Sequence, residues 1–223
     1  MGKKGWKIAL LAAMLVLPMV GKSQVYLKLN LPYACVGIIN PQLEFIVGPH
    51  SSVVIDPTYS PWRSVDGKHL NFGILQNEYR FYIKREAKGF YFSVNAGMQL
   101  FDLTRPYLFN KVGNKRKFIT WEPGFGRGFG VMVGLGIGYE HRFKERWVVD
   151  AFFAFDRMWS WYNDYNAQGE ISMYPNHHKP PIHEPDPFNG SAEWLPSKIG
   201  LSIGYMIFDP QRSKRKAEQA KSE

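Results

Sequence analysis

The stretch Gly128–Phe143, GFGVMVGLGIGYEHRF, decides the fold class of this chain. Every second residue is apolar, and most residues between them are small or charged. The apolar positions are Phe129, Val131, Val133, Leu135, Ile137 and Tyr139; the alternate ones are Gly128, Gly130, Met132, Gly134, Gly136, Gly138, Glu140 and Arg142. A period of two is typical of a β-strand with two different faces. A helix would spread both sets around its surface, and each of the five glycines would cost about 1 kcal/mol.

Two environments suit such a strand. A soluble sheet buries its apolar face against a second layer, whereas a membrane barrel turns that face to lipid and keeps the small and polar face inside. Beyond residue 23, no apolar run approaches the ~20 residues of a membrane-spanning helix. A membrane-spanning interpretation therefore requires strands.

The N-terminus has the pattern of a secretory signal. Lys3, Lys4 and Lys7 precede the apolar run Ile8–Val20, and small residues stand at Gly21 and Ser23. An anchor helix is the alternative, but this run is short and contains a proline. We expect a cleaved signal peptide at 1–23, one barrel domain at 24–208, and a basic periplasmic tail at 209–223.

The charge and the cysteine count narrow the function classes. Of 28 Lys and Arg, four lysines lie in the signal, so the mature chain carries 24 − 19 = +5. The remaining basic residues are dispersed, which argues against a nucleic-acid partner. The one cysteine, Cys35, cannot form an internal disulfide. We expect it to be a buried or loop thiol rather than a lipid attachment site.

Alternation recurs eight times along the chain. The segments are Gln24–Ala34, Gln42–Val47, Ser52–Ser60, His69–Lys84, Phe90–Leu103, Gly128–Phe143, Trp147–Trp161 and Trp194–Phe208. Pro57 is unfavourable in a central strand. The connections after the second, fourth and sixth segments are short. Those after the fifth and seventh (104–127 and 163–193) are long, and those after the first and third (37–41 and 61–68) are intermediate.

This organisation predicts an all-β fold, an eight-stranded antiparallel up-and-down transmembrane β-barrel. A soluble lipocalin-like barrel also has eight strands, but its outer face is polar and its apolar face lines a ligand cavity. Here the polar face carries both acids and bases, which suits a small closed interior where opposite charges neutralise each other. The expected interior charges are Lys28, Glu44, Asp56, Glu78, Arg80, Glu140, Arg142, Asp150, Asp156 and Lys198.

Aromatic residues cluster near the ends of the segments, as in the girdles of membrane barrels. We expect Tyr26, Phe90, Phe143 and Trp147 in a periplasmic girdle. The outer girdle would contain Tyr33, Tyr59, Trp62, Trp159 and Trp194.

Several short pieces carry a family resemblance: Lys28–Tyr33 (KLNLPY), Asn40–Glu44 (NPQLE), Tyr59–Trp62 (YSPW), Gln76–Arg80 (QNEYR), Gly138–Glu140 (GYE) and Pro196–Ser202 (PSKIGLS). In this order the sequence resembles a family of Bacteroidota outer-membrane barrels of unknown function, similar in architecture to the OmpA transmembrane domain. Lys198-x-Gly200-x-x-Ile203-x-Tyr205 also looks like the last-strand signal of the barrel assembly machinery, although it does not end the chain. Members of that family are often encoded near fimbrial or cell-surface genes, so the resemblance implies a cell-envelope role and no reaction.

Three motifs could carry chemistry. The run Gly124-x-Gly126-x-Gly128-x-Gly130 lacks the following helix of a phosphate loop, so we interpret its glycines as space-saving inside a narrow barrel. His177, His178 and His183 are weak metal-ligand candidates in a proline-broken loop. Ser160 lies near Asp156 and Asp164, but no local pattern indicates a catalytic triad.

The sequence therefore predicts a non-enzymatic outer-membrane protein of a Gram-negative cell, with no cofactor and no catalytic residue. The barrel would be a closed anchor in outer-membrane lipid, inserted by the barrel assembly machinery. Its loops 104–127 and 163–193 would meet surface or fimbrial proteins. The alternatives are a lipid-modifying outer-membrane enzyme, or a surface protein that captures a metal or another ligand.

Overall fold

The structure is a computed structural model, and it describes residues 23–65, 68–104, 125–144, 146–165, 168–170 and 189–210. The predicted signal peptide apart from Ser23, most of the basic tail and the histidines at 177, 178 and 183 lie outside these residues. So do most of the two long connections. Among the described residues, no helix is long and apolar enough to cross a membrane.

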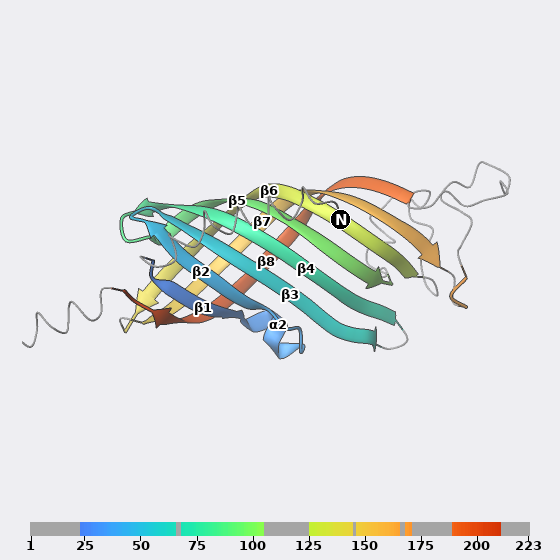
Figure 1. Cartoon of the computed structure of the whole chain (residues 1–223), viewed down its shortest axis with the longest axis horizontal. Coiled ribbons are helices and arrows are strands. Elements are labelled where there is room, and N and C mark those ends of the chain that lie inside the picture. Colours follow the sequence, from blue (N-terminus) through green and yellow to red (C-terminus); the bar gives the residue numbers. More distant parts are fainter. Residues whose placement is uncertain are drawn as a thin grey trace, which may run out of the picture.

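Within the described residues, eight strands and one short helix make up the fold (Figure 1). They are β1 (Val25–Asn30), α2 (Leu31–Cys35), β2 (Pro41–Gly48), β3 (Ser51–Val65), β4 (Lys68–Lys84), β5 (Lys88–Leu103), β6 (Phe125–Phe143), β7 (Trp147–Tyr165) and β8 (Asn189–Phe208). Each strand pairs antiparallel with the next, and β8 pairs with β1, so the sheet closes on itself as a barrel. The predicted all-β fold of eight up-and-down strands is confirmed.

The decisive stretch forms most of β6, which pairs along its length with β5 and β7. Gly134 stands opposite Asn95 and Asp156, and Leu135 stands opposite Val94 and Phe155. Because side chains alternate across a strand, each row of partners points the same way. The glycine row therefore faces the interior together with polar residues, and the leucine row faces outward.

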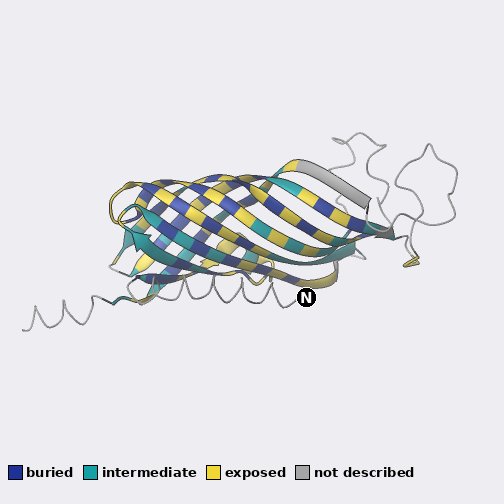
Figure 2. Ribbon diagram, turned by 45° about the horizontal axis from the view of Figure 1, so that its top comes forward, coloured by how far each residue is buried: buried dark blue, intermediate teal, exposed yellow. Residues whose placement is uncertain are grey.

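Burial follows the same alternation around the barrel and gives the chequered pattern of Figure 2. Acidic and basic side chains such as Glu44, Arg80 and Asp150 are fully buried, whereas Leu135 is 67% exposed and Ile199 70% exposed. The polarity of an ordinary soluble domain, with charges outside and apolar side chains inside, is thus reversed.

The ends of the barrel differ in their connections. The β2–β3, β4–β5 and β6–β7 turns are short and lie at one end, where β1 begins and β8 ends (Figure 1). This end is called the turn end below. Glu86, Ala87 and Lys144 have positive φ in these turns, as tight reversals require. The opposite ends of the strands, from which the β1–β2, β3–β4, β5–β6 and β7–β8 connections start, lie at the other end, called the loop end below.

Several predicted segment boundaries are wrong. At the loop end, β6 begins at Phe125 and not at Gly128, β7 runs to Tyr165 and not to Trp161, and β8 begins at Asn189 and not at Trp194. The first strand ends at Asn30, and Leu31–Cys35 forms α2, with Pro32 in its first turn, where a missing N–H costs nothing. Tyr33 is therefore not a strand residue of an outer girdle. The predicted 61–68 loop is also wrong, because β3 runs to Val65 and β4 begins at Lys68. Cys35 is exposed on α2 rather than buried.

Pro57 is tolerated inside β3 because of its neighbours. Tyr59 exchanges backbone hydrogen bonds with Ile39 at 2.8 and 2.9 Å. Alternate residues direct their N–H groups to the same side, so the nitrogen of Pro57 faces the β2 side, opposite Pro41 in the same register. Since Pro41 also lacks an N–H, the gap in the ladder falls where neither strand could donate.

Candidate functional site: the charge network inside the barrel

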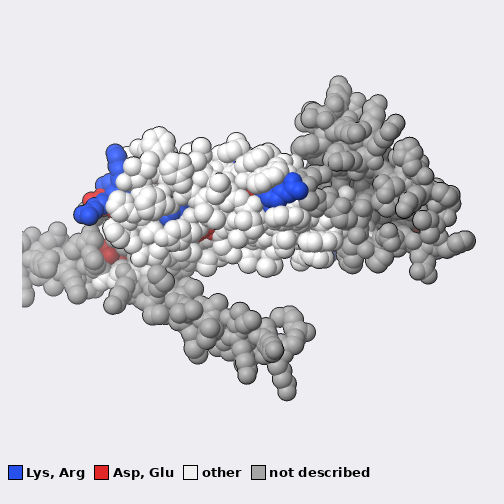
Figure 3. All heavy atoms as spheres, turned by 90° about the horizontal axis from the view of Figure 1, so that it is seen from above, with Lys and Arg blue, Asp and Glu red and all other residues white. Residues whose placement is uncertain are grey.

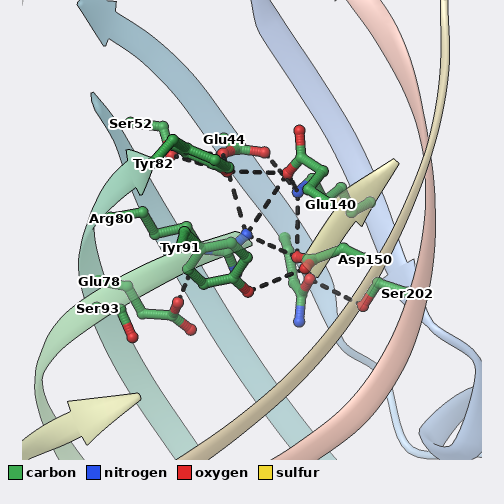
Figure 4. A network of polar contacts seen from close by, with 12 residues as sticks. Glu44, Ser52, Glu78, Arg80, Tyr82, Tyr91, Ser93, Glu140, Asp150 and Ser202 are labelled. Atoms are coloured by element: carbon green, nitrogen blue, oxygen red, sulfur yellow. Dashed lines mark hydrogen bonds and ion pairs between the residues drawn. The ribbon is translucent and has the colours of Figure 1, made fainter. Parts of the chain in front are cut away.

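Lys28 of β1 is the centre of the buried network at the turn end (Figure 4 shows this region). Its Nζ donates to Glu140 Oε2 at 2.6 Å and to Asp150 Oδ2 at 3.2 Å, and it also pairs with Glu44. All four side chains have no exposed surface. One cation therefore holds three carboxylates that come from β2, β6 and β7.

Arg80 of β4 provides a second buried cation. Its Nη1 donates to Asp150 Oδ2 at 2.6 Å, and its Nε donates to Glu78 Oε2 at 2.9 Å. The guanidinium carbon lies 4.4 Å from the centre of the Tyr91 ring, and the Tyr91 hydroxyl donates to Asp150 Oδ1 at 2.9 Å. The arginine is thus held by ion pairs and by a cation–π contact.

Tyr82 and Ser52 complete the shell around Glu44. The Tyr82 hydroxyl lies 2.7 Å from Glu44 Oε1 and 3.0 Å from Glu140 Oε2. Ser52 Oγ donates to Glu44 Oε1 at 2.5 Å. Sequence reasoning did not single out Tyr82 and Tyr91, although both have the inward parity of Arg80 and Ser93.

Tyr26 corrects the prediction of the periplasmic girdle. Its side chain is 2% exposed and lies beneath Arg142, whose guanidinium carbon is 4.7 Å from the ring centre. Arg142 in turn donates to Glu140 Oε1 at 2.9 Å. Tyr26 has the parity of Lys28 and points inward, so it belongs to the charge network and cannot contact a surrounding belt of lipid.

A second cluster surrounds Lys198 of β8. Its ammonium pairs with Asp56 of β3 and with Glu78 of β4, and lies 4.7 Å from the Phe152 ring centre. Glu78 also binds Arg80, so it joins the two clusters. Asp56 accepts further hydrogen bonds from Gln42 at 3.1 Å and from Asn40.

Asp156 of β7 is held by amides rather than by cations. Gln76 Nε2 donates to Asp156 Oδ2 at 2.7 Å, and Asn95 Nδ2 donates to Oδ1 at 3.3 Å. Ser160 is buried on the same face of β7, four positions further along the strand. Among the described residues, no hydrogen bond joins it to Asp156. The described contacts of this carboxylate are therefore those of the interior network.

All ten residues proposed as interior charges lie on the inner face. Nine are buried, and Arg142 is partly exposed at the turn end with 15% of its side chain accessible. Four cations face six acids there, and amide and hydroxyl donors satisfy the excess carboxylates. The sequence identified these residues, but it did not show which ones pair.

The glycines of β6 make room for this network. A Cβ at Gly138 would overlap the Tyr91 ring, one at Gly136 would overlap Ser93 Oγ, and one at Gly134 would overlap Asp156. On β8, a Cβ at Gly204 would lie 2.5 Å from Lys28 Cγ. The small inner face of the decisive stretch is thus a packing requirement, as in other close approaches of side chain to backbone.

Possible metal ligands are not gathered in the part of the chain that the structure describes. No group of three or more His, Cys, Asp and Glu among them could hold a metal ion. Their histidines, His50, His69 and His141, lie at the ends of strands and not beside the inner carboxylates. The metal candidates His177, His178 and His183 lie outside the described part of the chain and stay predictions.

The remaining predicted girdle residues apart from Trp62 lie on the outside, near the ends of the barrel. Trp62 has the inward parity of Ser60, and its Nε1 donates to Val36 O at 2.9 Å, so its place in the outer girdle is corrected. Phe90 is 64% exposed and Trp194 is 57% exposed. Tyr59, Trp147 and Trp159 are also exposed, and Phe143 is partly so. Neighbouring aromatic pairs extend these groups, with Phe90 edge-on to Tyr139 at one end and Phe129 stacked on Trp161 at the other.

A protein-family profile described as "Protein of unknown function (DUF3575)" matches residues 8–207. The chain belongs to this family. No match was found among the curated proteins or the solved structures. Membership of DUF3575 agrees with the resemblance to a family of unknown function; the Bacteroidota origin, the outer-membrane location and the likeness to OmpA stay predictions.

Proposed function

We propose that this DUF3575 protein is a non-enzymatic outer-membrane β-barrel that anchors a cell-surface interaction. The observation that carries the proposal is the reversed polarity of the barrel wall. Charges such as Lys28 and Asp150 are fully buried, whereas the outward residues of β6 are apolar and 39–67% exposed from Phe129 to Tyr139. In water such a surface would be an aggregation site, and in hydrocarbon it is the favourable arrangement.

The height of the apolar band supports the same location. Phe129 to Tyr139 is ten residue steps, and at ~3.3 Å per residue and a tilt of about 40° this rises ~25 Å. The apolar band of outer-membrane barrels is also ~25 Å tall. In Figure 3 the surface of this face is mostly uncharged between two groups of basic side chains, one at each end, with small basic and acidic patches between them.

The interior supports a plugged anchor rather than a channel. Large side chains such as Arg80, Tyr82, Tyr91 and Met132 are fully buried inside, and eight strands leave space for little else. The strand-alternating wall and the C-terminal pattern of β8 suit insertion by the barrel assembly machinery after removal of the signal. The interaction surface would be formed at the loop end by 104–127 and 163–193.

Membrane location is tested by expressing the full chain in a Gram-negative host and separating the inner and outer membranes. We expect the mature protein, beginning near Gln24, in the outer-membrane fraction and resistant to extraction by urea. Recovery as a dissolved protein without detergent would refute the proposal. Planar-bilayer recordings of the purified protein should show no conductance above leak.

The interaction surface is tested by cross-linking in the native host. Cys35 is exposed, so the parent chain carries Cys35→Ser. Single cysteines are then placed within 104–127 and within 163–193, with Arg85→Cys in the β4–β5 turn as the matched control. We expect a partner to be cross-linked from the loop positions and not from position 85. The same product from all positions, or from position 85 alone, would contradict a role for the loops.

A further inference from the structure

A basic pocket lies on the outer wall at the loop end, outside the buried network. It has a volume of about 330 Å³ and is lined by Arg63, His69, Asn71, Asp102 and Arg127, from β3, β4, β5 and β6. Two guanidinium groups face one carboxylate, so the lining carries a net charge of 2 − 1 = +1 with His69 neutral. This contrasts with the barrel interior, where acids outnumber bases.

Three of the lining side chains, His69, Asp102 and Arg127, are held by contacts with one another. Arg127 donates to Asp102 Oδ2 through Nη2 at 2.7 Å and Nε at 3.1 Å, and its guanidinium carbon lies 5.5 Å from the Tyr165 ring centre. His69 Nδ1 is 2.7 Å from Asp102 Oδ1, and the His69 ring stacks on Phe125 with ring centres 3.9 Å apart. Asp102 therefore holds two basic side chains in fixed positions.

Within the described residues, both arginines have donors for which no partner is seen. Arginine has five N–H donors, and Arg127 uses two of them on Asp102. Arg63 is exposed and has no ion pair or hydrogen bond within the part of the chain that the structure describes. Guanidinium groups match the geometry of phosphate oxygens, often with two parallel hydrogen bonds.

The level of the pocket along the barrel axis indicates which part of a membrane it would face. Asp102 and Arg127 are cross-strand partners one outward position beyond the apolar pair of Leu100 and Phe129. Two residues along a tilted strand rise ~5 Å. The headgroup region extends roughly 5–7 Å beyond the hydrocarbon core. If the apolar wall lies in hydrocarbon, these side chains lie at the level of lipid phosphates.

We propose that the pocket lined by Arg63, His69, Asn71 and Arg127, with Asp102 as the positioning carboxylate, binds the phosphate group of an anionic lipid in the loop-end leaflet. The site rests on the proposed membrane function, because that function places the pocket beside headgroups. The shared chemistry is a phosphate with two accessible oxygens, and a soluble phosphate ion is the other possible source.

The test uses the full-length protein refolded in neutral detergent, with bound lipids counted by native mass spectrometry. The probes are phosphatidic acid, phosphatidylcholine of the same chain length, and inorganic phosphate. Arg63→Gln/Arg127→Gln removes the two guanidinium groups. Arg85→Gln/Arg146→Gln removes the same charge at the turn end and is the matched control. Reduced mobility of boiled samples in electrophoresis checks that each variant folds.

We expect preferential retention of phosphatidic acid by the parent and by the control, and an about tenfold loss in Arg63→Gln/Arg127→Gln. Equal retention of both lipids, or equal losses in both double variants, would overturn the site. Displacement of the lipid by inorganic phosphate at equal concentration would overturn its assignment to a lipid. Flotation with phosphatidylcholine vesicles tests the membrane function separately. If the protein floats but does not prefer phosphatidic acid, only the proposed lipid site is refuted. If the protein does not float, the proposed membrane function is refuted.

Discussion

Replacing Lys28 by methionine tests whether the buried charges hold the barrel together. The substitution shortens the side chain by one atom and removes one of three cations, Lys28, Arg80 and Arg142, that serve Glu44, Glu140 and Asp150. Two cations are then left for three acids, in a place without solvent. Removing one partner of a buried ion pair costs about 3–5 kcal/mol.

The expected change can be measured by urea unfolding in phosphatidylcholine vesicles, followed by tryptophan fluorescence. With an m value of about 2 kcal/mol/M, the Lys28→Met midpoint should fall by about 2 M. Lys88→Met is the matched control, because Lys88 pairs with Glu86 on the surface. An exposed pair of this kind contributes roughly 0–1 kcal/mol, so this midpoint should hardly move.

A second substitution tests the reason for the loss. Adding Glu140→Gln to Lys28→Met leaves two cations for two acids, so the opposite charges are again equal in number. The glutamine keeps the shape of the glutamate side chain. The double variant should therefore be more stable than Lys28→Met by about 1–3 kcal/mol, as expected for directly coupled residues. The reasoning is refuted if Lys28→Met is as mild as Lys88→Met, or if Glu140→Gln makes it worse.

Three further outcomes are expected. Leu135→Arg, in the middle of the outward face, should cost about 2–4 kcal/mol in vesicles, whereas Leu100→Arg near the loop end should cost about 0–1 kcal/mol; equal costs would argue against hydrocarbon around the wall. Gly138→Ala should destabilise by about 1–3 kcal/mol through overlap with Tyr91, and the cost should fall toward zero in a Tyr91→Ser background; urea midpoints of all four chains check this. Cys35 should react with a small maleimide in the folded protein, without loss of tryptophan fluorescence, because it is exposed on α2.

The location of α2 and the extent of β3 show where local pattern was insufficient. The alternation of residues 24–34 continues to Tyr33, but β1 ends at Asn30, since Pro32 suits the first turn of a helix. Pro61 suggested a loop, yet cross-strand pairing with β4 continues as far as Val65. Pairing with β4 therefore decided where β3 ended, whereas the helix that Pro32 begins decided where β1 ended.

Tyr26 shows a different limit. Its aromatic type and its position at a strand start suggested the girdle, while its parity with Lys28 indicated the interior. Parity was the better guide, because a strand side chain cannot change faces without a shift in register. Arg142 above the ring supplies the polar surroundings that an inward tyrosine needs.

The sequence by itself determined the strands, their number and which face of each is polar, because alternation with a period of two is a local property of the chain. It also determined that charges of both signs share one face. Only the tertiary structure decided which charges meet. Lys28 pairs with Glu140 and Asp150, which lie 112 and 122 positions away, and this requires both closure of β8 on β1 and the relative shift of the strands around the ring. The basic pocket on the outer wall likewise exists because four strands bring together residues that are far apart in the chain.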